Sequence, residues 1–151
     1  MEYIQSGTGD VTPEGCVFCG IRDGHEAELV LARTDLAFVV LNKFPYNPGH
    51  LVVVPARHVG DIEALTTEEN AELQSLLQRA VGALRKESEP QGFNIGLNLG
   101  RVGGAGIPDH LHWHVVPRWS GDTNFMPVVG QTRVLPELLA DTHRRLAPRF
   151  A

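Results

Sequence analysis

Three histidines that alternate with apolar residues are the group in this sequence best suited to chemistry. His110, His112 and His114 are separated by Leu111 and Trp113, and such alternation is typical of a strand with one buried face. Side chains two residues apart share a face of a strand, so the three imidazoles should line up together. Clustered imidazoles suit metal binding, acid–base catalysis and nucleophilic catalysis. The alternative is a strand whose polar face carries histidine without a function.

Cys16 and Cys19 form a second candidate group, because two thiols at this spacing can bind a metal or act as a redox pair. A thioredoxin-like motif should open a helix after a strand, and Gly20 and the Asp23-Gly24 pair argue against that. Structural zinc normally takes four ligands, so two more would have to come from elsewhere, and histidine has suitable softness. Two unrelated buried thiols are the alternative.

A glycine-rich segment, Gly100–Gly106, leads to the histidines. Glycines let backbone N–H groups approach an anion without a side chain in the way. No helix is expected after this segment, so it is neither a Walker nor a Rossmann motif. An anion-binding loop and a flexible connection both fit.

The elements that must position these groups are a set of strands and two helices. The expected strands are Leu29–Arg33, Leu36–Asn42, His50–Pro55, Phe93–Leu99 and His110–Arg118. The second is almost continuously apolar and should be covered on both faces.

Thr66 to about Lys86 is expected to be the long helix, with a capping box formed by Thr66 and Glu69. Its buried stripe would consist of Leu73, Leu76, Leu77, Ala80, Val81 and Leu84. A last helix should open at Pro136 and end before Pro148. One side of it would carry Leu138, Leu139, Thr142 and Leu146.

Length, composition and charge limit which classes of protein this chain can belong to. A chain of 151 residues with 42% apolar and 21% charged residues is typical of one soluble domain with a real core. The net charge of −5 argues against a broad nucleic-acid-binding surface. Residues 1–15 are polar and are expected to form a flexible N-terminal arm. The sequence has neither a signal peptide nor a membrane-spanning stretch, so the expected location is the cytoplasm.

Two motifs together resemble the histidine triad (HIT) family of nucleotide-binding proteins. The segment from His110 to Val116 has the family's alternating histidines, and the segment from Asn47 to Val53 is similar to its second signature, a Pro-Gly-His strand start. The resemblance runs from about Cys16 to Arg118. The segment that follows, as far as Phe125, is similar to the branch that contains bacterial diadenosine tetraphosphate phosphorylases.

The resemblance implies an α+β fold for a single HIT domain over residues 1–151. It would have an antiparallel sheet of about five strands, one long helix and a C-terminal helix. The sheet is usually extended across a homodimer in this family, and the exposed edge of a small antiparallel sheet would favour such pairing.

The resemblance also implies an enzyme that cleaves dinucleoside polyphosphates at the α-phosphate, by water or by inorganic phosphate, through a nucleotidyl-histidine intermediate. By position, His112 would be the nucleophile, His114 would bind a phosphate oxygen and assist the leaving group, and His50 would hold the array. Imidazole is both a good nucleophile toward phosphorus and a good leaving group. No catalytic metal is required.

The nucleotide-binding positions that match the family are Asn42, Phe38, Leu41, Phe44, Asn98, Gly104, Ala105 and Gly106. Asn42 would bind ribose hydroxyls, the apolar residues would wall the base, and the backbone N–H groups of Gly104 to Gly106 would hold phosphate oxygens. Many members carry Gln, Ser or Thr before the triad, where this chain has Gly106-Ile107-Pro108. A side-chain donor to the leaving group is therefore missing.

For a structural zinc, the resemblance implies Cys16, Cys19, His58 and His110 as ligands. His58 follows the strand that starts at His50, and His110 begins the triad strand. Both would lie near the sheet end to which the N-terminal arm returns. The three histidines would then divide into one ligand and two catalytic groups.

Other functions remain open at the level of sequence. One is a nucleoside phosphoramidate hydrolase of the same mechanism, although the missing donor before the triad weakens that transfer. Another is a non-catalytic nucleotide-binding regulator, against which the intact triad argues. A third is a metal-dependent enzyme with all three histidines as ligands, against which the Pro-Gly-His strand and the glycine segment argue.

Overall fold

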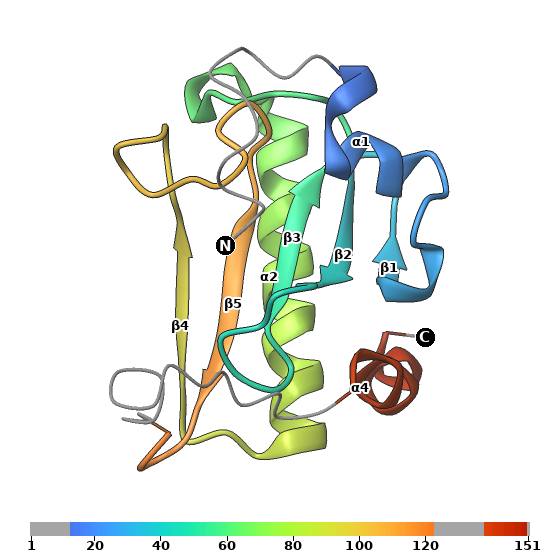
Figure 1. Ribbon diagram of the computed structural model, residues 1–151, viewed down its shortest axis with the longest axis vertical. Helices are drawn as coiled ribbons and strands as arrows, with labels where there is room; N and C mark the ends of the chain where they lie inside the picture. The colour runs from blue at the N-terminus through green and yellow to red at the C-terminus, as the bar shows by residue number, and fades with distance from the viewer. Residues whose placement is uncertain (1–12, 123–137, 151) are drawn as a thin grey trace.

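The fold is a five-stranded antiparallel sheet with helices on both faces, seen in a computed structural model that describes residues 13–122 and 138–150 (Figure 1). The strands are β1 (Val30–Arg33), β2 (Ala37–Leu41), β3 (Leu51–Pro55), β4 (Gly92–Leu97) and β5 (Trp113–Arg118), in the order β1-β2-β3-β5-β4. The helices are α1 (Val17–Arg22), α2 (Thr67–Ser88) and α4 (Leu139–Leu146). Short 3₁₀ turns are η2 (Pro13–Gly15), η3 (Ala27–Leu29), η4 (Ile62–Ala64) and η5 (Ala147–Arg149). The predicted α+β class and five antiparallel strands are confirmed.

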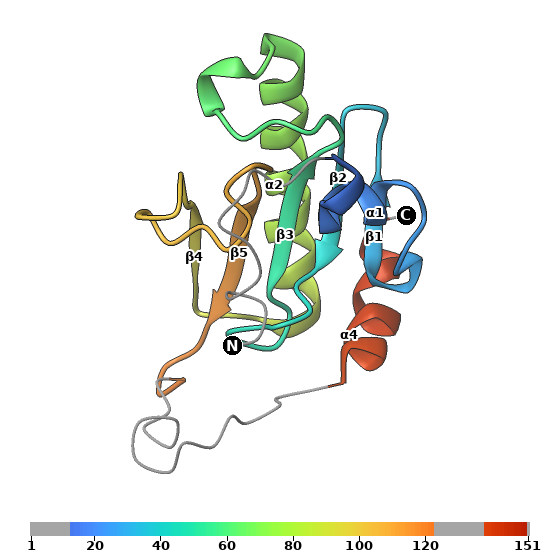
Figure 2. The same cartoon turned by 45° about the horizontal axis from the view of Figure 1, so that its top comes forward.

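Helix α2 packs along one face of the sheet (Figure 2). The capping box is formed as predicted: the Thr66 hydroxyl accepts from the Glu69 N–H, and the Glu69 carboxylate accepts from the Thr66 N–H. Of the predicted stripe, Val81 is only partly buried, and Ala83 is buried in addition. A capped helix with one apolar face is thus fixed against the strands that carry the histidines.

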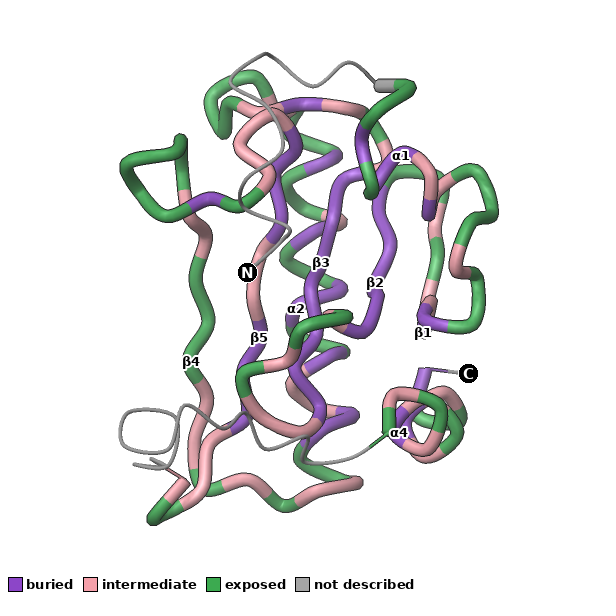
Figure 3. The backbone as a smooth tube through the Cα atoms, in the orientation of Figure 1, coloured by how far each residue is buried: buried purple, intermediate pink, exposed green. Residues whose placement is uncertain are grey.

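Strands β2 and β3 are buried along their whole length, and β4 is largely exposed (Figure 3). The register pairs Val40 with Val52 and Val52 with His114, so these side chains share the face opposite α2. Leu41, Leu51 and Val115 are likewise paired and share the face that packs on α2. The histidine face and the α2 face are therefore distinct.

The strand predicted from His110 to Arg118 begins only at Trp113. Continued to residue 111, the β3–β5 register would place Leu111 opposite Pro55, and proline has no N–H to offer a ladder. Instead, the Leu111 N–H donates to the Val59 carbonyl (2.8 Å), and the His110 ring binds the Pro55 carbonyl. His110 and His112 therefore precede the strand, and only His114 lies in it.

The C-terminal helix is shorter than predicted in its described part. It begins at Leu139, and Leu138 is 68% exposed at its N-cap instead of buried, whereas Thr142 and Leu146 are buried as expected. Pro136 and residues 1–12 of the expected N-terminal arm lie outside the described residues. Among the described helices, none is long and apolar enough to cross a membrane.

Candidate active site and metal centre

His50, His112 and His114 form one cluster on the face of the sheet opposite α2. The ring centroids of His112 and His114 lie 5.0 Å apart, and those of His50 and His114 lie 5.1 Å apart. His50 ends the β2–β3 loop, where its N–H donates to the Asn47 carbonyl (3.1 Å). The structure thus brings together the three histidines assigned to catalysis.

The glycine of the Pro-Gly-His segment is needed for this placement. Gly49 has a φ of +81°, and a Cβ there would lie 3.0 Å from a methyl of Leu84 on α2. Only glycine adopts this conformation and accepts this close approach without strain. Gly49 therefore allows the loop to lie against the helix, so that His50 enters the cluster directly before β3.

A chain of hydrogen bonds fixes the tautomers of His50 and His114. The Tyr46 N–H donates to His50 Nδ1 (3.1 Å), so the neutral His50 ring carries its proton on Nε2. That Nε2–H donates to His114 Nδ1 (3.0 Å). His114 accordingly carries its own proton on Nε2.

His112 has the opposite tautomer. Its Nδ1–H donates to the backbone carbonyl of His110 (2.8 Å), which leaves Nε2 with a lone pair. The ring is buried and packs against Phe18 of α1, with ring centroids 5.0 Å apart. A neutral imidazole with a fixed, unprotonated Nε2 is the form that can act as a nucleophile.

The three rings are neutral at physiological pH. Burial, followed by the neighbouring His114 and His112, lowers the pKa of His50 to about 3. Burial and then His112 lower the pKa of His114 to about 4. The pKa of His112 is also lowered by burial, although its hydrogen bond to the His110 carbonyl opposes this.

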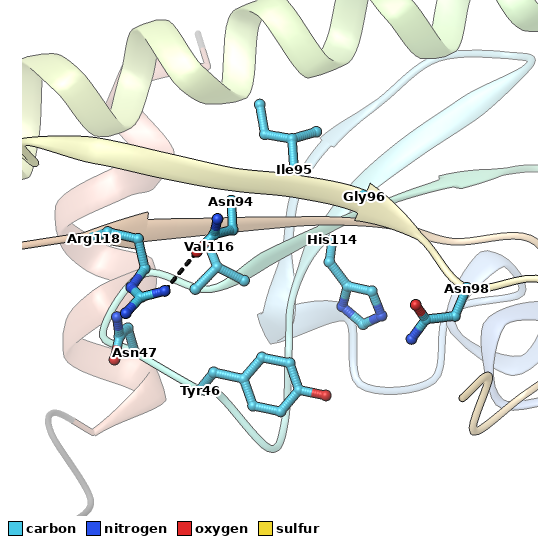
Figure 4. A pocket seen from close by; sticks show the side chains of 9 residues that line it. All are labelled: Tyr46, Asn47, Asn94, Ile95, Gly96, Asn98, His114, Val116 and Arg118. Carbon is cyan, nitrogen blue, oxygen red and sulfur yellow. Dashed lines mark hydrogen bonds between the residues drawn. The ribbon is translucent and has the colours of Figure 1, made fainter. Parts of the chain in front are cut away.

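An elongated hollow of about 440 Å³ continues from His114 along β4 and β5 (Figure 4). Its lining consists of Tyr46, Asn47, Asn94, Ile95, Gly96, Asn98, His114, Val116 and Arg118. His114 and Asn98 lie toward one end, Arg118 and Asn47 toward the other, and Tyr46 lies across from the strands.

The glycine segment supplies fewer backbone donors than expected. The Gly104 N–H donates to the Arg101 carbonyl (3.0 Å), and the Ala105 N–H donates to the Gly100 carbonyl (3.1 Å). Of the three N–H groups predicted to hold phosphate oxygens, only that of Gly106 has no partner among the described residues. Asn98 bonds the Gly104 carbonyl (3.3 Å) and lines the hollow.

The other predicted nucleotide-binding residues are divided between the two faces of the sheet. The Asn42 amide nitrogen lies 3.3 Å from His50 Nε2, and its oxygen accepts from the N–H of the exposed Phe44. Phe38 is on the histidine face but 1% exposed. Leu41 lies on the α2 face, so the structure does not bring its side chain to the histidines.

A separate cluster contains the four residues predicted to bind zinc. The ligand atoms of Cys16, Cys19, His58 and His110 all lie within 4.8 Å of one another. His110 Nδ1 is 3.3 Å from Cys16 Sγ and 3.7 Å from Cys19 Sγ, and His58 Nδ1 is 3.4 Å from Cys19 Sγ. The ligand atoms of a tetrahedral zinc lie about 3.3–3.8 Å apart, so these three distances and the set of two thiols and two imidazoles fit this ion.

The protonation of the cluster also suits a metal. The His110 Nε2–H donates to the Pro55 carbonyl (2.8 Å), which leaves Nδ1 as the ligand atom. Burial and the neighbouring Cys16 raise the pKa of Cys19 to about 11. Two buried thiolates side by side are unfavourable without a cation, and a zinc ion would supply the positive charge that stabilises them.

Sequence reasoning missed two aromatic residues beside the histidines. Tyr46 stacks on His50, with centroids 4.8 Å apart and planes at 26°, and Phe18 lies against His112. The sequence Pro-Tyr-Asn-Pro in the β2–β3 loop could have indicated a role for Tyr46, because two prolines stiffen the loop that carries this aromatic ring. Nothing in the sequence distinguished Phe18 from an ordinary core residue.

Comparisons with known proteins found a matching family and similar chains. A family model described as "HIT domain" matches residues 24–121. The chain is 52% identical over 126 residues to the AP-4-A phosphorylase of Mycobacterium tuberculosis (strain ATCC 25618 / H37Rv), with 83% of this chain and 65% of the relative covered. It is 32% identical over 93 residues to an asymmetrical bis(5'-nucleosyl)-tetraphosphatase of Schizosaccharomyces pombe, with 62% and 50% covered.

Among solved structures, a zinc-bound histidine triad family protein from Mycobacterium smegmatis superposes with a TM-score of 0.76 at 28% identity. The match covers 92% of this chain and 95% of that one. The chain spans 65% of the length of the M. tuberculosis relative.

Proposed function

The chain belongs to the HIT family, and we propose that it cleaves dinucleoside polyphosphates of the diadenosine tetraphosphate type at the α-phosphate. The observation that carries this proposal is the pair of opposite tautomers: an unprotonated Nε2 on His112 beside a protonated Nε2 on His114. One ring is prepared to attack phosphorus and the other to donate a hydrogen bond. The similarity to proteins named for AP-4-A phosphorylase and for tetraphosphatase activity supports the substrate class.

The proposed reaction has two steps. In the first, the Nε2 lone pair of His112 forms a bond to the α-phosphorus, and the bond from phosphorus to the bridging oxygen breaks. The leaving nucleoside polyphosphate takes the electron pair, and the Nε2–H of His114 donates to the departing oxygen. The product of this step is a nucleotidyl group on His112.

In the second step, the oxygen of water or of inorganic phosphate attacks the same phosphorus. The bond between phosphorus and nitrogen breaks, and its electron pair returns to His112 Nε2. Water loses a proton to the solvent and gives a nucleoside monophosphate, and phosphate gives a nucleoside diphosphate. His50 would act on this chemistry by holding His114, and Asn42, whose amide lies beside His50, would bind a ribose hydroxyl.

We further propose that Cys16, Cys19, His58 and His110 hold one structural zinc ion. Four protein ligands leave no open position for water or substrate, so the ion would take no part in the reaction. It would tie α1 to the ends of β3 and β5, since the two cysteines lie at α1 and the two histidines follow β3 and precede β5.

Product analysis tests the proposal. The protein is incubated with diadenosine tetraphosphate, with and without inorganic phosphate. Hydrolysis at the α-phosphate yields AMP and ATP, and phosphorolysis yields ADP and ATP. Symmetric cleavage to two ADP without phosphate, or no cleavage by zinc-replete protein, would overturn it. A nucleoside phosphoramidate assayed in parallel distinguishes the alternative substrate class.

A further inference from the structure

We propose that the hollow between His114 and Arg118 binds the leaving nucleoside of the dinucleoside polyphosphate, with the Tyr46 ring stacked on its base. This inference rests on the proposed function and extends it to the half of the substrate that departs. The residues that carry it are Tyr46, Asn94, His114 and Arg118, all of which line the same hollow (Figure 4).

The tautomer of His114 sets the direction in which the leaving group lies. Its Nδ1 accepts from His50, so its only proton is on Nε2, and the His114 side chain forms one end of the hollow. The oxygen that leaves phosphorus must approach that proton. In this proposal, the polyphosphate chain begins there and follows the face of β5 that carries positions 114, 116 and 118.

Tyr46 has the properties of a stacking surface. Its side chain is 69% exposed although it is the largest apolar group on this side of the hollow. One ring face is stacked on His50, and its backbone N–H is bound to the same histidine. The adjacent Asn47 anchors the loop to the Pro117 carbonyl (3.0 Å). The ring is therefore held in place before a ligand arrives, which lowers the entropic cost of binding.

The far end of the hollow suits an uncharged group better than a phosphate. Arg118 forms two hydrogen bonds to the Asp122 carboxylate (2.6 and 2.7 Å), so its charge is balanced locally. It also donates to the Asn94 side-chain oxygen, which leaves the Asn94 amide N–H groups for a ligand. Amide donors beside a balanced ion pair match the hydroxyls and ring nitrogens of a nucleoside.

The test compares two substrates, one with a second nucleoside and one with an ionisable terminal phosphate in its place. Diadenosine tetraphosphate and adenosine 5'-tetraphosphate share the transferred adenylyl group and the phosphate chain. The full chain, wild type and variant, is assayed for kcat/KM with each, and the quantity compared is the ratio between the two substrates. A variant that lowers kcat/KM equally for both substrates would show that Tyr46 supports His50. A change in the ratio of the two kcat/KM values would show that Tyr46 contacts the second nucleoside.

Tyr46→Leu is expected to lower this ratio by about tenfold, because a base stacked on an aromatic ring loses that contact. Tyr46→Phe keeps the ring and should keep the ratio. Phe44→Leu is the matched control: Phe44 is a neighbouring exposed aromatic assigned to the transferred base, which both substrates carry. An unchanged ratio in Tyr46→Leu, or an equal fall in Phe44→Leu, would overturn the proposal.

A binding measurement separates failure of this inference from failure of the proposed function. In a His112→Ala background, calorimetry should show diadenosine tetraphosphate binding about tenfold more tightly than adenosine 5'-tetraphosphate, and Tyr46→Leu should remove the difference. Equal affinities in the His112→Ala protein would reject the nucleoside site. If the wild-type protein cleaves neither compound, the proposed function fails, and the affinities still decide the site.

Discussion

At the scale of single residues, each imidazole has its role set by the partner of its other nitrogen. The His110 carbonyl holds His112 Nδ1–H, the Pro55 carbonyl holds His110 Nε2–H, and a backbone N–H holds His50 Nδ1. In the proposed function, histidine would thereby serve as a nucleophile at one position, as a metal ligand at another and as a hydrogen-bond donor at a third. Two of these three partners are backbone carbonyls, which accept a hydrogen bond at any pH.

Replacement of the proposed nucleophile is the sharpest test at this scale. His112→Ala should lower turnover of diadenosine tetraphosphate by about a thousandfold or more. The circular dichroism spectrum and the zinc content should be retained. Activity within about tenfold of wild type, or an adenylyl adduct trapped on another residue, would refute the assignment of His112.

The lowered pKa values predict how activity depends on pH. Because burial lowers the pKa of both His112 and His114 below the ordinary imidazole value, we expect kcat/KM to stay level as the pH falls through 6.5 and to drop only at a lower pH. Zinc content is measured at each pH, so that loss of metal is not mistaken for titration. An acid limb centred on the ordinary imidazole value of 6.5 would contradict the lowered pKa values.

The free energy of unfolding, like the activity, should fall as the pH is lowered. His50 has a pKa of about 3 in the folded protein and about 6.5 in the unfolded chain, so below pH 6.5 the unfolded state binds the proton first. The stability present above pH 6.5 is therefore lost progressively as the pH falls toward the folded value. Denaturant melts at two or three pH values would measure this loss.

At the scale of elements, side-chain periodicity predicted a strand that carries His114 but not where that strand begins. Leu111 is buried as expected, but His110 and His112 are buried as well, so burial does not alternate there. Backbone pairing stops at Trp113, because the facing residue on β3 is Pro55. The position of Pro55 opposite Leu111 depends on strand register, which a single sequence does not reveal.

The N-terminal cap of α2 contributes a measurable share of stability. Thr66→Ala removes the hydroxyl that accepts from the Glu69 N–H and should cost about 1 kcal/mol. For a chain of this size that corresponds to a fall in Tm of roughly 2–4 °C. Thr67→Ala is the matched control, since Thr67 is exposed in the first turn and makes no capping bond. Equal effects of the two changes would argue against the cap.

The proposed zinc site links elements that are far apart in sequence, so loss of the ion should affect stability more than chemistry. Protein purified without chelator should contain about one zinc per chain. Cys16→Ser should lose that zinc and lower Tm, with a much smaller effect on turnover per folded molecule. The exposed Ser120→Ala serves as a control. Zinc-free wild-type protein with unchanged Tm would show that the cluster does not depend on a metal.

At the scale of the whole molecule, β4 is the open edge of the sheet. In the described part of the chain it pairs only with β5, whereas β1 at the other edge is contacted by α4. Ile95, in the middle of β4, is 49% exposed. Open edges with apolar side chains are sites for pairing with a second chain.

We therefore predict a homodimer joined through β4. Light scattering at micromolar concentration should give twice the chain mass of 16.5 kDa. Ile95→Lys should shift the protein toward monomer, and Val102→Lys, at a fully exposed position outside the strand, should not. A monomer mass for the wild-type protein would disprove the prediction.

The order of the strands was the part of the fold that patterns within the sequence could not supply. Periodicity located most of the elements and the buried stripe of α2, but neither periodicity nor the family resemblance placed β5 between β3 and β4. The hollow beside His114 was not predicted at all. It is formed by a loop and two strands whose relative placement depends on that order.

The hydrogen-bond chain from the Tyr46 amide through His50 to His114 also bears on which bonds this site can break. An amide N–H keeps its proton, so the neutral pair of His50 and His114 could release the Nε2 proton of His114 only if one of the two rings became an imidazolate. His114 can stabilise a departing atom by hydrogen bonding but is poorly suited to protonate it. A nucleoside polyphosphate departs as a stable anion, whereas an amine must be protonated to leave. The site should therefore discriminate by leaving-group basicity, in favour of phosphate oxygens over amines.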